Sequence, residues 1–219
     1  MSDKPRELSI SNLQRLYAIV VSLAIAESLR RLLSDYGDNG QLPEFASMVA
    51  VFSLLITVIP YFHGANRYLE ATYITGESKV KSQTLMLDFV ALFVEGLIFF
   101  ILAVVIEKTQ VFFTILAALF VYSSVWISFR YLSTSRGNKI PFVLSWPIAN
   151  LTAAALLLII VWPGLLRWSL GLSSTAMNVG LGATALLRTV YDYYSSWDFY
   201  VPSGKMTDSM PSRGPQRRK

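Results

Sequence analysis

The chain has 219 residues, of which 53% are hydrophobic and 15% are charged, so it is far more apolar than a typical soluble domain. Its formal charge of +5 fits a membrane protein whose basic residues face anionic lipid, and direct nucleic-acid binding is not expected. The absence of cysteine excludes disulfides and thiol chemistry.

The chain begins with a polar segment, residues 1–12, which we expect to form a cytoplasmic head. The apolar segment Leu13–Leu33 follows, but its uncharged run ends at Glu27, which is short for a membrane span. Glu27 and Arg31 are four residues apart and can form an ion pair on one helix face. We interpret the segment as a spanning helix with a polar face; a helix lying in the membrane interface is the alternative. Turn-forming residues predict a loop at Ser34–Pro43.

Five further apolar segments are long enough to cross a bilayer. They are Glu44–Gly64, Ser82–Ile106, Val111–Leu132, Pro141–Trp162 and Ala176–Trp197. Because the connection between the third and fourth spans is very short, these two are expected to be antiparallel neighbours. The sequence therefore predicts an all-α, polytopic protein with six transmembrane helices in residues 13–200. The basic tail, residues 201–219, is rich in Ser, Pro, Arg and Lys and is expected to be disordered.

The distribution of Lys and Arg predicts the orientation of the six spans. With a cytoplasmic N-terminus, most of these residues fall on the cytoplasmic side. Those on the opposite side are Arg30, Arg31, Lys108 and Arg167. This asymmetry follows the positive-inside rule when both termini are cytoplasmic. We therefore expect an integral membrane protein, with the bacterial inner membrane as its location.

Carboxylates occur inside these spans, where each costs about 2.5–3.5 kcal/mol unless it faces protein or water. Asp88 and Glu95 lie seven residues apart in the third span and so nearly on one helix face. No cationic residue is expected at the depth of Glu95, which must therefore be protonated, face water or pair across subunits. Each of these states suits an ion pathway, in which Glu27 would lie nearer the far side.

A second group of polar residues is expected at the cytoplasmic ends of the spans. Its members are His63, Arg67, Asp88, Arg130, Arg188 and Asp192. One interpretation is a structural network in which arginines neutralise aspartates, including a pair between Arg188 and Asp192 within one helix. The other is a ligand pocket, since arginines suit an anionic, nucleotide-like ligand.

Several site classes find no support in the sequence. One histidine and no cysteine make a metal site unconvincing. The motifs of hydrolases, phosphate-binding loops and intramembrane metalloproteases are missing. The sequence therefore predicts neither an enzyme nor a cofactor.

The segment Tyr17-Ala18-Ile19-Val20-Val21-Ser22-Leu23 resembles the first-helix signature of one potassium channel family. These are the six-helix channels of endosomes, lysosomes and bacteria that lack a selectivity-filter loop. Their signature has an aromatic residue, then Ala-Ile, then Thr-Leu two residues on. His63 near the end of the second span and the six-span plan also fit.

The resemblance implies that the first helix lines a pore with apolar residues, which makes Ile19, Leu23 and Ala26 pore candidates. The chain departs from the family just upstream, where Asn12-Leu13-Gln14 stands in place of Phe-Ser-Asp. Those family residues anchor the helix packing around the pore, so the family's channel mechanism does not carry over.

Two functions follow as hypotheses. The first is an oligomeric channel, with cations as the expected ions and the pore on the symmetry axis of a homo-oligomer in the lipid bilayer. The second is a membrane-embedded sensor, effector or accessory protein, for example in bacterial defence or signalling. Such a protein would receive a cytoplasmic protein or an anionic ligand at the arginine cluster.

Overall fold

The computed structural model describes residues 4–40, 42–74, 82–133, 144–162 and 173–201, and these contain helices and no strand. The helices are α1 (Lys4–Asn39), α2 (Phe45–Tyr73), α3 (Ser82–Val104), α4 (Thr109–Ser133), α5 (Ser145–Val161), α7 (Ser174–Ser195) and α8 (Trp197–Tyr200). The prediction of an all-α chain is confirmed. The expected tail at 201–219 lies outside the described residues, except for Val201.

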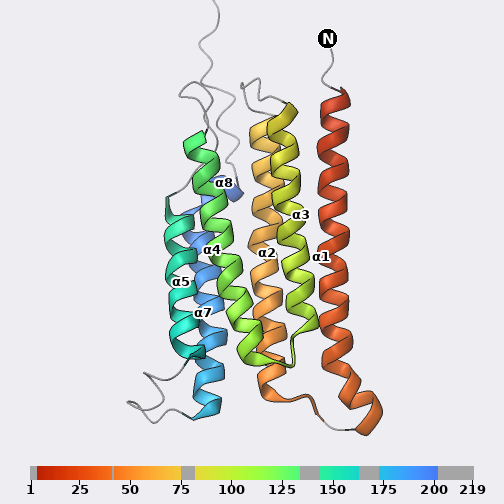
Figure 1. Cartoon of the computed structure of the whole chain (residues 1–219), viewed down its shortest axis with the longest axis vertical. Helices are drawn as coiled ribbons and strands as arrows, with labels where there is room; N and C mark the ends of the chain where they lie inside the picture. Colours follow the sequence, from red (N-terminus) through yellow and green to blue (C-terminus); the bar gives the residue numbers. More distant parts are fainter. Residues whose placement is uncertain (1–3, 41, 75–81, 134–143, 163–172, 202–219) are drawn as a thin grey trace, which may run out of the picture.

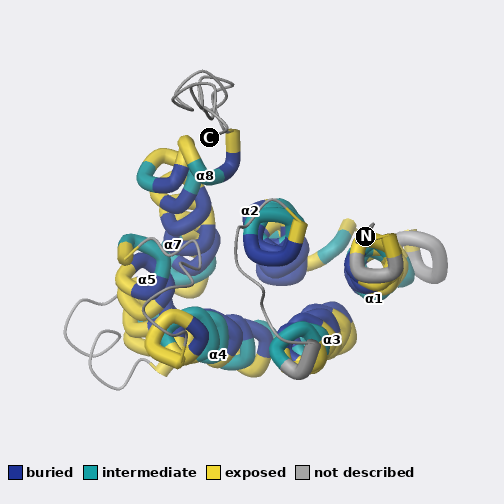
Figure 2. The backbone as a smooth tube through the Cα atoms, turned by 90° about the horizontal axis from the view of Figure 1, so that it is seen from above, coloured by how far each residue is buried: buried dark blue, intermediate teal, exposed yellow. Residues whose placement is uncertain are grey.

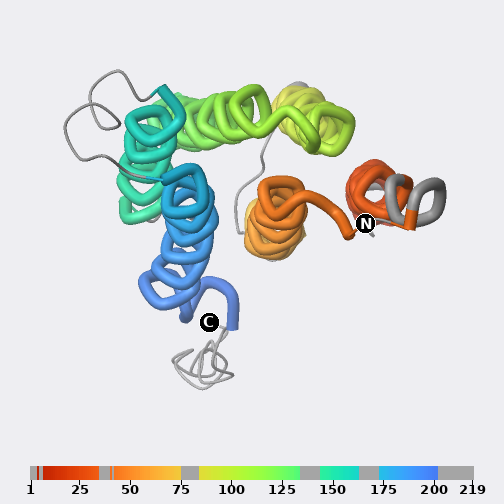
Figure 3. Tube along the Cα trace, turned by 90° about the horizontal axis from the view of Figure 1, so that it is seen from below, coloured from red at the N-terminus to blue at the C-terminus, as the bar shows by residue number. Residues whose placement is uncertain are grey.

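The long helices run up and down side by side, and α1 begins at the same end of the bundle as α8 (Figure 1). Helix α2 is central and contacts α1, α3, α4, α7 and α8, with the other long helices around it (Figures 2 and 3). Helices α3 and α4 are in contact, as expected from their short connection. Helix α1 stands at one edge and packs mainly against α2 and α3.

Three of the described helices are long and apolar enough to cross a membrane: α2, α3 over Thr84–Val104, and α4. Helix α5 is also apolar, but its 17 residues extend only about 26 Å at 1.5 Å per residue. These helices fit an integral membrane protein.

The end of α1 differs from the prediction of a loop at Ser34–Pro43. The helix includes Gly37 and continues to Asn39, because one glycine inside a helix costs only about 1 kcal/mol. It ends where Gly40 adopts a φ of 64°, the left-handed conformation typical of a residue just after a helix. The polar residues from Lys4 onward belong to the same helix.

Pro60 lies inside α2 and would leave a backbone carbonyl unpaired. Proline has no N–H, so it cannot donate to the carbonyl of Ile56, four residues earlier. The hydroxyl of Thr189 in α7 donates to that carbonyl instead, at 3.0 Å. The proline is therefore tolerated because α7 replaces the missing bond, as expected where water is absent.

Close packing of α1 on α3 depends on Gly96. A Cβ added there would lie 2.9 Å from Cγ1 of Val20 in α1, whereas one added at Gly180 would meet Ile160 at an ordinary 3.6 Å. We expect Gly96→Ala to cost about 1–3 kcal/mol of packing strain, since the branched side chain of Val20 is stiff at χ1. Better helix propensity offsets about 1 kcal/mol of that cost.

Thermal unfolding in detergent measures the effect, with Gly180→Ala as the matched control, expected to be neutral or stabilising. The double variant Gly96→Ala/Val20→Ala should relieve the strain at the interface. If Gly96→Ala and Gly180→Ala were equally stable, this account of α1 packing would be wrong.

Candidate functional site

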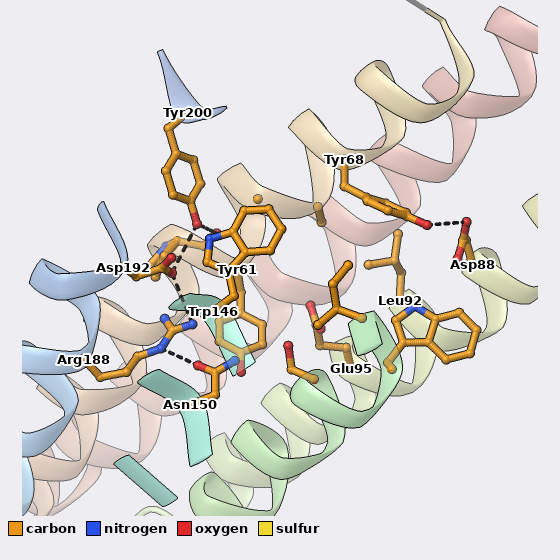
Figure 4. A pocket seen from close by; sticks show the side chains of 16 residues that line it. Tyr61, Tyr68, Asp88, Leu92, Glu95, Trp146, Asn150, Arg188, Asp192 and Tyr200 are labelled. Atoms are coloured by element: carbon orange, nitrogen blue, oxygen red, sulfur yellow. Dashed lines mark hydrogen bonds and ion pairs between the residues drawn. The ribbon is translucent and has the colours of Figure 1, made fainter. Parts of the chain in front are cut away.

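A cavity of about 100 Å³ lies between α2, α3, α4, α5, α7 and α8, toward the end of the bundle where α8 lies. Its polar lining includes Tyr61, Asp88, Glu95, Asn150, Arg188 and Asp192. Figure 4 shows Arg188, Asp192 and Asn150 on one side of it, and Glu95 and Asp88 on the other. The cavity therefore joins residues from distant parts of the chain that the sequence analysis had singled out.

Asp88 of α3 is completely buried and forms a two-pronged ion pair with Arg130 of α4. Arg130 Nε donates to Oδ1 at 2.8 Å and Nη2 donates to Oδ2 at 3.1 Å. The hydroxyls of Tyr68 and Tyr73 in α2 also donate to Oδ2. The carboxylate is thereby fully paired, and three helices are tied together at one point.

Arg188 of α7 is held by a different set of partners. Its Nε donates to Oδ1 of Asn150 in α5 at 2.7 Å, and its Nη2 lies 3.2 Å from Oδ2 of Asp192. The predicted pair within α7 is confirmed. The guanidinium also lies over the rings of Tyr61 and Phe120, at 4.9 and 5.3 Å from their centroids.

Buried polar atoms of the lining are left without a hydrogen-bond partner among the described residues. They are Arg188 Nη1, Asp192 Oδ1, Trp146 Nε1 and the hydroxyl of Tyr61. The side chains of Arg188 and Asp192 are only 5% and 3% exposed. A buried polar atom without a partner costs about 1–3 kcal/mol, and more when charged. These atoms are two N–H donors, one carboxylate oxygen and one hydroxyl that can donate or accept.

Glu95 of α3 is buried and lines the same cavity. The hydroxyl of Tyr17 in α1 donates a hydrogen bond to its carboxylate. Arg188 lines the same cavity, although its ion pair is with Asp192 and not with Glu95. Helix packing brings Arg188 there from a span that is distant in the sequence.

His63 and Arg67 do not line the cavity. His63 contacts the C-terminal end of α7, and Arg67 contacts α8. His63 Nδ1 lies 3.2 Å from the hydroxyl of Tyr193. Arg67 pairs with Glu70 and donates to the backbone carbonyl of Phe199 at 3.2 Å. The predicted arginine cluster is therefore split, since Arg67, Arg130 and Arg188 each have a separate carboxylate partner.

Helix α8 contributes Tyr200 to the cavity wall. Its hydroxyl donates to Oδ2 of Asp192 at 3.2 Å and lies 3.5 Å from the backbone carbonyl of Pro60. Gly64 of α2 lies close to the same ring, because a Cβ added at Gly64 would meet the hydroxyl oxygen of Tyr200 at 3.4 Å. The position of α8 is thereby linked to a residue of the cavity.

The remaining predicted residues lie on α1, away from the cavity. Ile19 and Leu23 are 57% and 55% exposed, and Ala26 is exposed as well. Glu27 pairs with Arg30 and, as predicted, with Arg31. In the single chain these residues are not brought together with Glu95.

Aromatic and amide residues of the site were not predicted as site residues from the sequence. They are Tyr17, Tyr61, Tyr68, Tyr73, Trp146, Asn150 and Tyr200. One signal was present for Asn150, an amide inside an apolar span, where polar groups are rare and need partners. The tyrosines carry no such signal, because they are common near membrane interfaces.

No three His, Asp or Glu residues come together to hold a metal ion in the part of the chain that the structure describes. Comparison with protein-family models, curated proteins and solved structures finds no match. The geometry of the cavity is therefore the basis for a proposed function.

The ion pair of Asp88 and Arg130 should be essential for stability. We expect Asp88→Ala to lower the free energy of unfolding by about 3–5 kcal/mol, because it leaves a buried arginine without its counter-charge. Thermal unfolding in detergent measures this loss. The matched control is Glu27→Ala, which breaks partly exposed pairs of α1 and should change stability much less; equal losses would contradict the assignment.

Proposed function

We propose that this protein is a membrane-embedded sensor or effector that binds a small polar ligand in the cavity between α2 and α7. The observation that carries the proposal is the pair of buried, charged atoms in its wall that lack a partner among the described residues, Arg188 Nη1 and Asp192 Oδ1. Native proteins rarely leave such atoms unpaired unless water or a ligand completes them. A site of this kind in a concave pocket with aromatic residues in its wall is typical of small-molecule binding.

The contacts of α8 indicate how binding would be transmitted. Tyr200 shares Asp192 with the cavity, and Arg67 holds the backbone at Phe199. A ligand that binds Asp192 competes with or strengthens the bond to Tyr200, and so changes the position of α8. The C-terminal end of the chain would then report occupancy to a cytoplasmic partner.

We propose six membrane-crossing helices, with α1, α5 and α7 joining the three long apolar ones, in a bacterial inner membrane. The Lys and Arg distribution supports cytoplasmic termini. Charged residues of α7 are tolerated within the bilayer because Arg188 and Asp192 face the bundle interior and each other. The cavity then opens in the cytoplasmic half of the protein.

Single cysteines test access to the cavity cleanly, because the chain has none of its own. Ser123 lines the cavity, whereas Ser53 of α2 is fully buried elsewhere. We expect a small water-soluble thiol reagent added to the cytoplasmic side to modify Ser123→Cys rapidly and Ser53→Cys hardly at all. Labelling rates in inside-out vesicles measure this difference. Equal rates at both positions would contradict a discrete cavity.

A homo-oligomeric cation channel is the second candidate, favoured by the exposed apolar face of α1 at Ile19 and Leu23. A pore through the single chain is disfavoured, since the half of the bundle beyond Glu95 is packed with buried apolar side chains. Among them are Phe99, Leu102, Ile106, Phe112, Phe113 and Leu116. A pore would therefore have to lie between subunits, with α1 on the symmetry axis.

Ion flux into liposomes separates the two candidates. If the protein is a sensor, we expect the potassium flux to be the same with Glu95 and with Gln at this position, across a range of pH. The control is Glu95→Gln, which keeps the size of the side chain and its bond to Tyr17, with mass photometry to verify the oligomer. Flux that disappears in this variant while assembly is retained would favour the channel.

A further inference from the structure

One carboxyl group of the cavity wall, Glu95, has no ion-pair partner among the described residues. Asp88 is neutralised by Arg130 and Asp192 by Arg188. Glu95 has the hydroxyl of Tyr17 as a partner, but no Lys, Arg or His lies within ion-pair distance of it among the residues that the structure describes. A ligand that carries one positive charge would supply the ion-pair partner that Glu95 lacks.

The walls of the cavity suit an organic cation. The rings of Tyr68, Trp126 and Trp146 line it, together with Tyr61. Aromatic faces attract ammonium groups, and tryptophan attracts them most strongly. An anionic ligand is disfavoured, because Arg188 already has two polar partners, Asn150 and Asp192.

The buried polar atoms that lack partners in the described chain define the rest of the ligand. Asp192 Oδ1 needs a donor, such as an N–H of an ammonium group. Arg188 Nη1 and Trp146 Nε1 need an acceptor, which a hydroxyl oxygen can supply. The cavity volume of about 100 Å³ is several times the roughly 10–15 Å³ that one water molecule requires, so the cavity admits a ligand of a few non-hydrogen atoms.

We infer that the cavity binds a small organic amine in its ammonium form that also carries a hydroxyl, that is, an amino alcohol. The ammonium group lies toward Glu95 and Asp192, and the hydroxyl oxygen accepts from Arg188 and Trp146. This inference rests on the proposed ligand-binding function and names the chemical class of the ligand. The amino alcohol is either a free metabolite or the head group of a lipid, since both present the same chemistry.

Isothermal titration calorimetry tests the class on the full chain in phosphatidylglycerol nanodiscs. Ethanolamine is the probe; ethylene glycol, which lacks the charge, and acetate, which reverses it, are the matched controls. We expect ethanolamine to bind at least about tenfold more tightly than either control, as the loss of one charge-assisted hydrogen bond implies. In Glu95→Gln its affinity should fall by about tenfold or more, and in Glu27→Gln it should stay unchanged.

A second variant guards against loss of folding. Asp192→Asn keeps the shape of the side chain but removes its charge, and should also weaken ethanolamine binding, with thermal unfolding verifying that each variant is folded. A repeat with phosphatidylethanolamine in the nanodiscs distinguishes the sources. Unchanged titration there indicates a free amino alcohol, whereas lost titration indicates a head group already bound; both support the class.

Some results would overturn the amine assignment alone, and others would overturn the proposed function as well. Acetate or ethylene glycol binding as tightly as ethanolamine would overturn the amine assignment while keeping a ligand cavity. Ethanolamine affinity unchanged in both folded variants would place its site elsewhere and overturn the assignment too. No binding of any probe in phosphatidylglycerol nanodiscs, together with no labelling of Ser123→Cys, would overturn both.

Discussion

The buried ion pair of Asp88 and Arg130 is the interaction on which the rest of the bundle depends. Two charges removed from water are tolerated only when geometry and further hydrogen bonds complete them. Here two guanidinium nitrogens and two tyrosine hydroxyls surround one carboxylate. Because these groups come from α2, α3 and α4, satisfying one aspartate fixes the relative positions of three helices, and with them one side of the cavity.

The other side of the cavity is organised around α2 and its proline. Pro60 removes a hydrogen bond from inside a helix, and Thr189 of α7 replaces it. The same region of α2 lies against Tyr200 of α8. The contacts around Pro60 thus bring α7 and α8 to α2, and Arg188 and Asp192 come with them.

Hydrogen bonding is complete around Asp88 and incomplete around Arg188 and Asp192. This contrast is the reason for placing a ligand site at Arg188 and Asp192. A carboxylate whose oxygens are all occupied is part of the framework. Arg188 and Asp192 each keep one buried atom without a partner in the described chain. Glu95 lines the same cavity and has no ion-pair partner among the described residues. Buried polar groups with unfilled hydrogen-bonding capacity are typical of a binding site. The contrast also changes the expected ligand, because paired arginines attract anions weakly, whereas a cation would supply the ion-pair partner that Glu95 lacks.

Composition and the length of the apolar runs were sufficient to predict the all-helical class and most of the long helices. Long apolar runs predicted the helices over α2 to α5, because a run of that length can bury its backbone only as a helix in the membrane. Spacing of four residues predicted the pairs of Glu27 with Arg31 and of Arg188 with Asp192, since such positions are neighbours on any helix. The end of α1 was misplaced, because a single glycine weakens a helix without ending it.

Only the tertiary structure decided which charges meet between helices. From the sequence, Asp88, Arg67, Arg130 and Arg188 formed one cluster at similar depth. Depth, however, does not specify the direction in which each helix turns its polar face. In the packed bundle Arg130 pairs with Asp88, and Arg67 donates to the backbone carbonyl of Phe199. Arg188 and Glu95 line one cavity. Those choices depend on how side chains from several helices fit together, which local spacing does not determine.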